Sequence, residues 1–203
     1  MSDPALFPEN LSRIILTGFM GAGKTTVGAL LAERLGWGFV DSDHVVEERA
    51  GMTIAQIFER RGETAFRELE AAAVRDAGSE DRLVLALGGG ALEMAATRGF
   101  LASQTDTLLV FLEAPLATMI ARCEGHDNGP VRPVLADPKR LAERWRQRLP
   151  WYRQAHLTVE TDELSPEAVM ECIMERLKPW PVRSQPMTEP SSAESPGKPG
   201  VVA

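Results

Sequence analysis

The segment Gly18-Phe-Met-Gly21-Ala-Gly23-Lys24-Thr25 decides the fold, because it matches the phosphate-binding pattern G-x-x-x-x-G-K-[ST] at every fixed position. A β-branched run at 13–17 precedes it, and a helical pattern at 24–35 follows it. Glycines let backbone N–H groups point at a phosphate, and the helix that follows directs its positive end to the same anion. The segment therefore predicts a loop that binds a nucleoside triphosphate; a plain glycine-rich turn is the alternative.

Within this loop, the side chains of Lys24 and Thr25 carry the chemistry. We expect Lys24 to reach the β- and γ-phosphates and the Thr25 hydroxyl to bind Mg²⁺. The predicted nucleotide-binding set is Gly21, Ala22, Gly23, Lys24, Thr25 and Thr26. The loop alone leaves the phosphoryl acceptor open, since either water or a small molecule could receive the group.

The composition predicts one soluble domain in a reducing compartment, the cytoplasm. The chain has 203 residues, 44% of them hydrophobic, and only two cysteines, which are too few for a disulfide framework or a metal site of their own. A net charge of -7 disfavours nonspecific binding of nucleic acid. No apolar stretch is long enough to span a membrane, and no secretory signal is recognisable. The acidic balance and the absence of a repeat favour a monomer.

The chain divides into a loose N-terminal lead at 1–10, a folded region at 11–180 and a disordered tail at 181–203, which is rich in Pro and Ser. Strand and helix patterns alternate through the folded region. We predict strands at 13–17, 39–40, 83–87, 107–112 and 157–159, and helices at 24–35, 44–50, 54–58, 63–77, 138–148 and 166–177. This alternation predicts a parallel sheet covered on both faces, with ligands bound at the carboxyl ends of the strands.

Two carboxylates follow the second predicted strand, at the end of the sheet where the phosphate loop lies. Asp41 and Asp43 are one residue apart, so one could serve a Mg²⁺-bound water and the other an acceptor hydroxyl. The alternative is that Asp43 caps the helix predicted at 44–50.

Two arginines fall beside apolar positions of predicted helices. Arg67 lies next to the stripe of Phe66 and Leu69 and three residues before Glu70, which indicates a partly buried position; a surface ion pair is the alternative. Arg148 falls on the apolar face of its helix, where a buried guanidinium needs an anion; an extended side chain with a solvated head is the alternative.

Two loops have features typical of ligand contact. Gly88, Gly89 and Gly90 end the third predicted strand and indicate close approach of the backbone to a ligand, or else a flexible turn. The polar segment at about 123–133 is typical of a mobile lid, in which Arg132 could fold over a bound triphosphate; the alternative is an ordinary surface loop.

Taken together, these motifs resemble the shikimate kinase family. The resemblance is carried in chain order by the phosphate loop through Gly28, by Asp41-Ser-Asp43, by Phe66-Arg67-x-x-Glu70, by Gly88-Gly89-Gly90, by Val131-Arg132-Pro133 and by Arg148-x-Pro150-x-Tyr152. It implies a three-layer P-loop kinase fold like that of nucleoside monophosphate kinases, with a five-stranded parallel sheet and a mobile lid. It also implies ATP-dependent phosphorylation of the 3-hydroxyl of shikimate, in the pathway to chorismate and aromatic amino acids.

The resemblance also implies a role for each matching residue. Asp43, Arg67, Gly88, Gly89, Gly90 and Arg148 would bind shikimate, with both arginines on its carboxylate and Asp43 on the reacting hydroxyl. Lys24, Asp43 and Arg132 would be catalytic, Arg122 and Arg132 would contact ATP, and Thr25 and Asp41 would hold Mg²⁺. The rival functions are a sugar-acid kinase of the gluconate type and a nucleotide-binding module without activity; a GTPase is disfavoured because no Asn-Lys-x-Asp segment is present.

Overall fold

The computed structural model describes residues 11–125 and 137–177. The lead predicted at 1–10, most of the predicted lid with Arg132, and the predicted tail lie outside the described residues. Among the described helices, none is long and apolar enough to cross a membrane.

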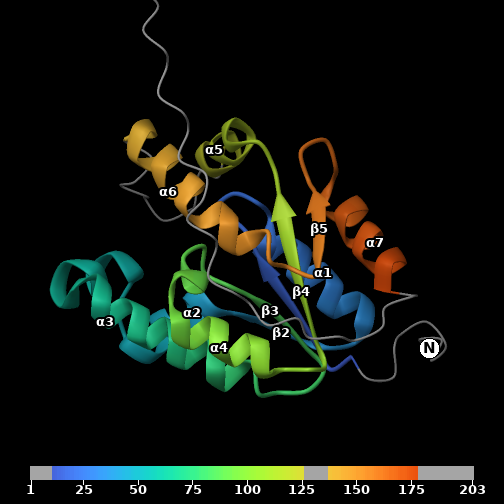
Figure 1. Ribbon diagram of the computed structural model, residues 1–203, viewed down its shortest axis with the longest axis horizontal. Helices are drawn as coiled ribbons and strands as arrows, with labels where there is room; N and C mark the ends of the chain where they lie inside the picture. The colour runs from blue at the N-terminus through green and yellow to red at the C-terminus, as the bar shows by residue number, and fades with distance from the viewer. Residues whose placement is uncertain (1–10, 126–136, 178–203) are drawn as a thin grey trace, which may run out of the picture.

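The centre of the fold is a sheet of five parallel strands in the order β2-β3-β1-β4-β5 (Figure 1). Its strands are β1 (Arg13–Thr17), β2 (Gly38–Asp41), β3 (Leu83–Ala86), β4 (Thr107–Glu113) and β5 (Leu157–Glu160). All residues of β1 and β3 are buried, as continuous apolar runs in a parallel sheet require. The predicted five-stranded parallel sheet is therefore confirmed.

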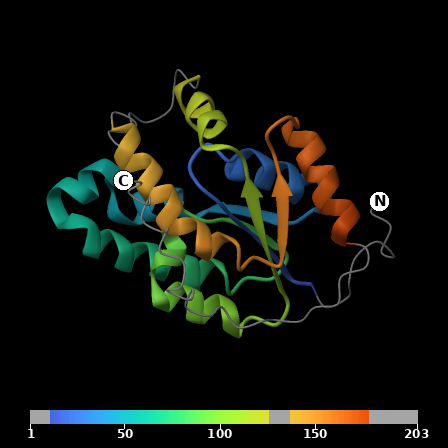
Figure 2. The same ribbon diagram turned by 45° about the horizontal axis from the view of Figure 1, so that its top comes forward.

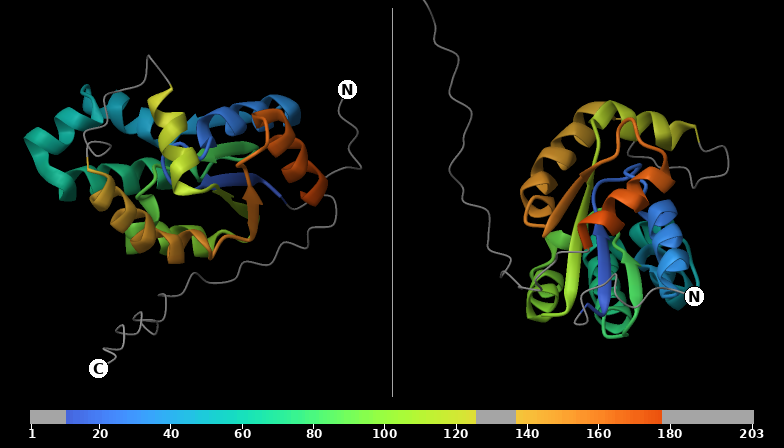
Figure 3. Two further views of the ribbon diagram at one scale, coloured as in Figure 1. Left: turned by 90° about the horizontal axis from the view of Figure 1, so that it is seen from above. Right: turned by 90° about the vertical axis from the view of Figure 1, so that its right-hand side faces the viewer.

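Helices cover both faces of the sheet, with α1 and α7 on one side and α4 and α6 on the other (Figure 3). The helices are α1 (Lys24–Leu35), α2 (Ser42–Ala50), α3 (Ile54–Ala77), α4 (Ala95–Ser103), α5 (Leu116–Glu124), α6 (Pro138–Tyr152) and α7 (Pro166–Leu177), with a short 3₁₀ helix, η2 (Ala91–Glu93). The sequence patterns gave no bounds for α4, α5 or η2. The layered α/β architecture places the loops after β1, β2 and β3 along one edge.

Helices α2 and α3 form an arm that projects from the side of the sheet opposite α7 (Figures 1 and 2). The arm has a small core of its own, made by Val46, Ile57, Phe66 and Ala73. Thr53 starts α3 with the predicted capping box. Gly62 interrupts the helix with φ 79° and ψ 173°, a conformation that glycine adopts readily. The arm thus presents the second half of α3, which carries Arg67, to the sheet.

Two boundaries differ from the sequence prediction in ways that matter for the site. Asp41 rather than Asp43 caps α2, because the helix starts two residues earlier than predicted and the Asp41 side chain accepts a hydrogen bond from the Asp43 N–H. Helix α6 continues through Pro150 to Tyr152 instead of ending at Arg148. Pro150 lies in the last turn, where it removes only one hydrogen bond from the helix, and the buried Tyr152 anchors that turn.

Candidate active site

The phosphate loop lies between β1 and α1 and has the close backbone packing that its glycines predict. Gly21 has φ 75°, and a Cβ there would lie 2.2 Å from the Met119 carbonyl oxygen, so only glycine fits. Lys24 Nζ donates hydrogen bonds to the carbonyl oxygens of Gly18 at 2.8 Å and Phe19 at 3.0 Å. The Lys24 ammonium group is therefore held over the loop by the loop's own backbone.

Thr25 and Asp41 meet at the mouth of this loop. The Thr25 hydroxyl donates to Asp41 Oδ2 at 2.7 Å, while Asp41 Oδ1 accepts from the Asp43 N–H at 3.0 Å. Among the described residues, no group of three or more His, Cys, Asp or Glu side chains could hold a metal ion. A hydroxyl and a carboxylate at one point beside a phosphate loop nevertheless suit Mg²⁺, which keeps several waters and takes further ligands from substrate phosphates.

The glycine turn after β3 passes so close to charged side chains that a methyl group would not fit. A Cβ at Gly88 would lie 2.3 Å from Glu70 Oε1 and 2.5 Å from Asp43 Oδ1. A Cβ at Gly90 would lie 2.4 Å from Arg67 Nη2. The alternative of a merely flexible turn is therefore wrong, because the turn packs tightly against three of the charged residues of this edge.

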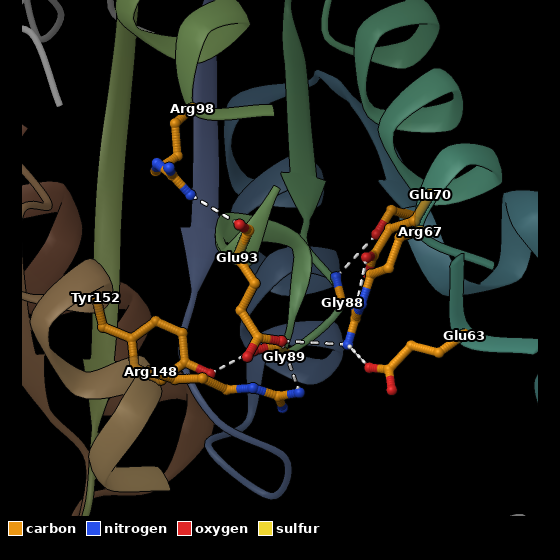
Figure 4. Close-up of polar contacts among 10 residues, drawn as sticks. Glu63, Arg67, Glu70, Gly88, Gly89, Glu93, Arg98, Arg148 and Tyr152 are labelled. Carbon is orange, nitrogen blue, oxygen red and sulfur yellow. Dashed lines mark hydrogen bonds and ion pairs between the residues drawn. The ribbon is translucent and has the colours of Figure 1, made fainter. Parts of the chain in front are cut away.

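Arg67 is buried in a cluster of carboxylates (Figure 4). Its Nη1 donates to Glu70 Oε2 at 2.7 Å, and its Nη2 lies 3.4 Å from Glu63 Oε1. The side chains of Arg67 and Glu70 are only 10% and 1% exposed, so the alternative of a surface ion pair is wrong. Burial raises the pKa of Glu70 to about 7, outweighing the opposing effect of Arg67. Burial alone would lower the pKa of Arg67, but the carboxylates around it, Glu70 first, raise it.

Arg148 is also buried, with 8% of its side chain exposed, so the alternative of a solvated head is wrong. Its anion is Glu93: Arg148 Nη2 lies 2.9 Å from Glu93 Oε2, and Arg67 Nη2 lies 3.2 Å from the same oxygen. Sequence reasoning missed Glu93. The only local signal was its place three residues after the glycine turn, in a short 3₁₀ helix with no pattern of its own.

Two side chains support this arrangement from behind. The Tyr152 hydroxyl donates to the Gly89 carbonyl oxygen, and the ring of Tyr152 stacks on Phe111 with 5.2 Å between ring centroids. Arg98 Nη1 donates to the carbonyl oxygens of Leu92 at 2.9 Å and Glu93 at 2.8 Å. These contacts hold the glycine turn and η2 in place.

An open pocket adjoins Arg67 between the arm and η2. It is lined by Glu63, Thr64, Arg67, Glu68, Glu93 and Met94. Arg67 lines this pocket, and its partner Glu70 lies beside Gly88 next to Asp43, so a small acid could bind here near Asp43.

Arg122, a predicted contact to ATP, lies in the last turn of α5. It donates to Thr161 Oγ1 at 3.0 Å and to the Asp162 carbonyl oxygen at 3.1 Å, which connects α5 to the segment after β5. Arg132 lies outside the described residues. The structure thus brings the predicted residues of the loops after β1, β2 and β3 and of α3 and α6 to one edge of the sheet.

Comparisons with known proteins point in one direction. The family model described as shikimate kinase matches residues 20–178. A shikimate kinase of Moorella thermoacetica is 40% identical over 169 residues, which cover 82% of this chain and 95% of that protein.

Solved structures agree with the sequence relatives. The structure described as shikimate kinase from Acinetobacter baumannii in complex with shikimate superposes with a TM-score of 0.75 at 40% identity, and covers 83% of this chain and 93% of that one. A gluconokinase from Sinorhizobium meliloti has a TM-score of 0.56 at 17% identity over 84% and 95% of the two chains, and so shares the fold alone.

Proposed function

This chain belongs to the shikimate kinase family, and we propose that it transfers the γ-phosphoryl group of ATP to the 3-hydroxyl of shikimate, giving shikimate 3-phosphate and ADP. The observation that carries the proposal is the meeting of two buried guanidinium groups, Arg67 and Arg148, on one carboxylate oxygen close to the phosphate loop. Paired arginines are suited to recognising a planar carboxylate, which shikimate carries; gluconate carries one too, so the acceptor assay has to separate the two acids.

The acceptor is held by its acid group at one end and by its hydroxyl at the other. Arg67 and Arg148 bind the carboxylate, and the glycine turn at 88–90 provides the close backbone wall against the ring. Asp43 lies against the first residue of this turn, where its Oδ1 would be 2.5 Å from a Cβ at Gly88. In that position Asp43 accepts the hydrogen bond of the reacting hydroxyl and takes up its proton as the phosphoryl group is transferred.

The phosphates are held by the loop at 18–25, with the Lys24 ammonium group beside the transferring group. Phosphoryl transfer needs alignment and charge stabilisation more than covalent chemistry, and backbone N–H groups and Lys24 provide both. Arg122 and Arg132 remain the predicted contacts to ATP from the end of α5 and from the lid segment.

Mg²⁺ fits the oxygen pair of Thr25 and Asp41, which lie 2.7 Å apart at the loop. When bound there, the ion neutralises phosphate charge and orients the triphosphate. Thr25 would hold it through the hydroxyl, and Asp41 directly or through a water.

The test is ADP release by the purified protein with ATP and Mg²⁺, with and without shikimate, alongside gluconate as a rival acceptor. We expect release only with shikimate. In Lys24→Ala, kcat falls by about 10³-fold, because electrostatic stabilisation of the transferring group is lost, while shikimate binding changes little. A folded protein that binds ATP but releases ADP with gluconate or with no acceptor contradicts the proposal.

A further inference from the structure

Glu93 occupies the position at which two arginines converge. Its Oε2 atom lies 3.2 Å from Arg67 Nη2 and 2.9 Å from Arg148 Nη2 (Figure 4). This is the place that a substrate carboxylate must take if both arginines are to bind it. A protein carboxylate and a substrate carboxylate cannot occupy the same place at once, so the two compete.

Glu93 pairs with only part of the Arg148 guanidinium group. The Nε atom of Arg148 is buried and has no hydrogen-bond partner among the described residues. A carboxylate in bidentate geometry pairs with both Nε and Nη2 of a guanidinium, whereas Glu93 offers one oxygen and shares it with Arg67. A buried donor without a partner is unfavourable, so an incoming carboxylate that reaches Nε gains a bond that Glu93 does not make.

Glu93 is the carboxylate that both arginines share, and its side chain is exposed enough to leave. Its side chain is 35% exposed, whereas that of Glu70 is 1% exposed. The backbone at Glu93 is fixed by Arg98, whose guanidinium stacks on Trp151 at 3.8 Å. Rotation of the partly exposed Glu93 side chain toward solvent would therefore release both arginines from Glu93 without moving η2.

In the absence of substrate, the Glu93 carboxylate stabilises the buried arginines. Arg67 and Arg148 are buried cations pointing at one place, and an unneutralised buried charge is strongly unfavourable. Glu70 and Glu63 also pair with Arg67, whereas among the ion pairs of the described residues Glu93 is the carboxylate that pairs with Arg148, and it keeps that place until a substrate carboxylate replaces it.

We propose that Glu93 is an internal competitor of the substrate carboxylate and thereby sets the affinity for shikimate. This inference rests on the proposed function of the same site. Because binding requires the state in which Glu93 has turned away, the apparent Kd equals the intrinsic Kd divided by the population of that state.

The test measures binding of shikimate, and of its uncharged methyl ester, to the wild-type protein, Glu93→Gln and Glu93→Ala by calorimetry. We expect the Kd for shikimate to fall by about 3- to 10-fold in both variants, as for a competing state populated at roughly 70–90%. The Kd for the ester stays within about 2-fold, since the ester has no carboxylate to compete with Glu93. Glu59→Gln, which removes a negative charge from an exposed position of α3 outside this pocket, is the control and leaves both values near wild type.

A weaker affinity for shikimate in both variants overturns the proposal, because it identifies Glu93 as a group that positions the arginines. Equal changes for acid and ester overturn it as well, since they indicate a change of pocket shape.

A different measurement tests the proposed function, which fails if the wild-type protein releases no ADP with shikimate. In that event cyclohex-1-ene-1-carboxylate, which has the ring carboxylate but no hydroxyl, replaces shikimate in the binding comparison. Tighter binding of this acid to Glu93→Gln than to the wild type supports the role of Glu93 as an internal competitor, and unchanged or weaker binding rejects that role.

Discussion

The hydroxyl of Tyr152 donates a hydrogen bond to the carbonyl oxygen of Gly89, which joins the last turn of α6 to the glycine turn after β3. Arg148 projects from the same end of α6, so one helix end both supports the turn and supplies a guanidinium group to the site. Burial raises the pKa of Tyr152, so the hydroxyl keeps its proton and remains a donor. Two elements that are 63 residues apart in the sequence are thereby held together.

Replacing Tyr152 by Phe tests this support. The variant keeps the stacking on Phe111 but leaves the Gly89 carbonyl oxygen without its donor, so we expect unfolding free energy to fall by about 1–2 kcal/mol. Because the turn is the proposed wall of the acceptor site, we expect the KM for shikimate to rise by about 3- to 10-fold. Urea unfolding and steady-state kinetics measure the two effects, and a stability loss with an unchanged KM would limit Tyr152 to a purely structural role.

Removing the guanidinium of Arg67 tests carboxylate recognition. We expect Arg67→Ala to raise the KM for shikimate by about 100-fold and Arg67→Lys by about 10-fold, since lysine keeps the charge but loses the planar fork. Arg60→Ala, an exposed arginine on the same helix, is the control and leaves the KM unchanged. An unchanged KM in Arg67→Ala would remove Arg67 from the site.

A single methyl group at Gly90 tests the close approach of the turn. Its Cβ would lie 2.4 Å from Arg67 Nη2, so Gly90→Ala must displace the guanidinium, and the KM for shikimate rises by about 10-fold or more. At Gly99, within α4, an added Cβ meets nothing within 4 Å. Gly99→Ala should therefore stabilise the protein by about 0.5–1 kcal/mol and leave the KM unchanged. Similar KM values for the two variants would contradict the tight packing at Gly90.

The buried carboxyl of Glu70 predicts a pH dependence of stability. Its pKa of about 7 in the folded protein lies above the ordinary value of 4.5, so the folded state holds a proton that the unfolded state releases. Proton binding at Glu70 therefore contributes to the free energy of unfolding. This contribution is fully present below pH 4.5 and is lost as the pH rises through about 7, for a total on the order of 3 kcal/mol.

Because glutamine does not titrate, Glu70→Gln should gain stability relative to wild type as the pH rises. Urea unfolding of both proteins at about pH 5 and about pH 8 measures the difference. We expect the unfolding free energy of Glu70→Gln, relative to that of the wild type, to rise by about 2–3 kcal/mol from the lower pH to the higher. A difference independent of pH would show that Glu70 ionises in the fold at its ordinary pKa.

The local parts of this protein could be predicted from sequence because their patterns depend on nearby residues. The β-branched run before the loop, the glycines of the loop and the capping box at Thr53 are each set by backbone geometry over a few positions. The start of α2 was misjudged because Asp41 and Asp43 are both plausible caps, and only the observed N–H contact separates them. The end of α6 was misjudged because Pro150 normally stops a helix, whereas burial of Tyr152 holds the last turn.

The sequence by itself determined the parallel α/β fold and the phosphate loop, because short-range spacing and strand–helix alternation carry that information; the acceptor residues stay a prediction from the family resemblance. Only the tertiary structure decided which charges face one another. Glu93 lies between Arg67 and Arg148 because the glycine turn, α3 and α6 converge at one edge of the sheet. No local pattern encodes that convergence: burial of two cations from distant helices requires an anion, and packing determines which carboxylate supplies it.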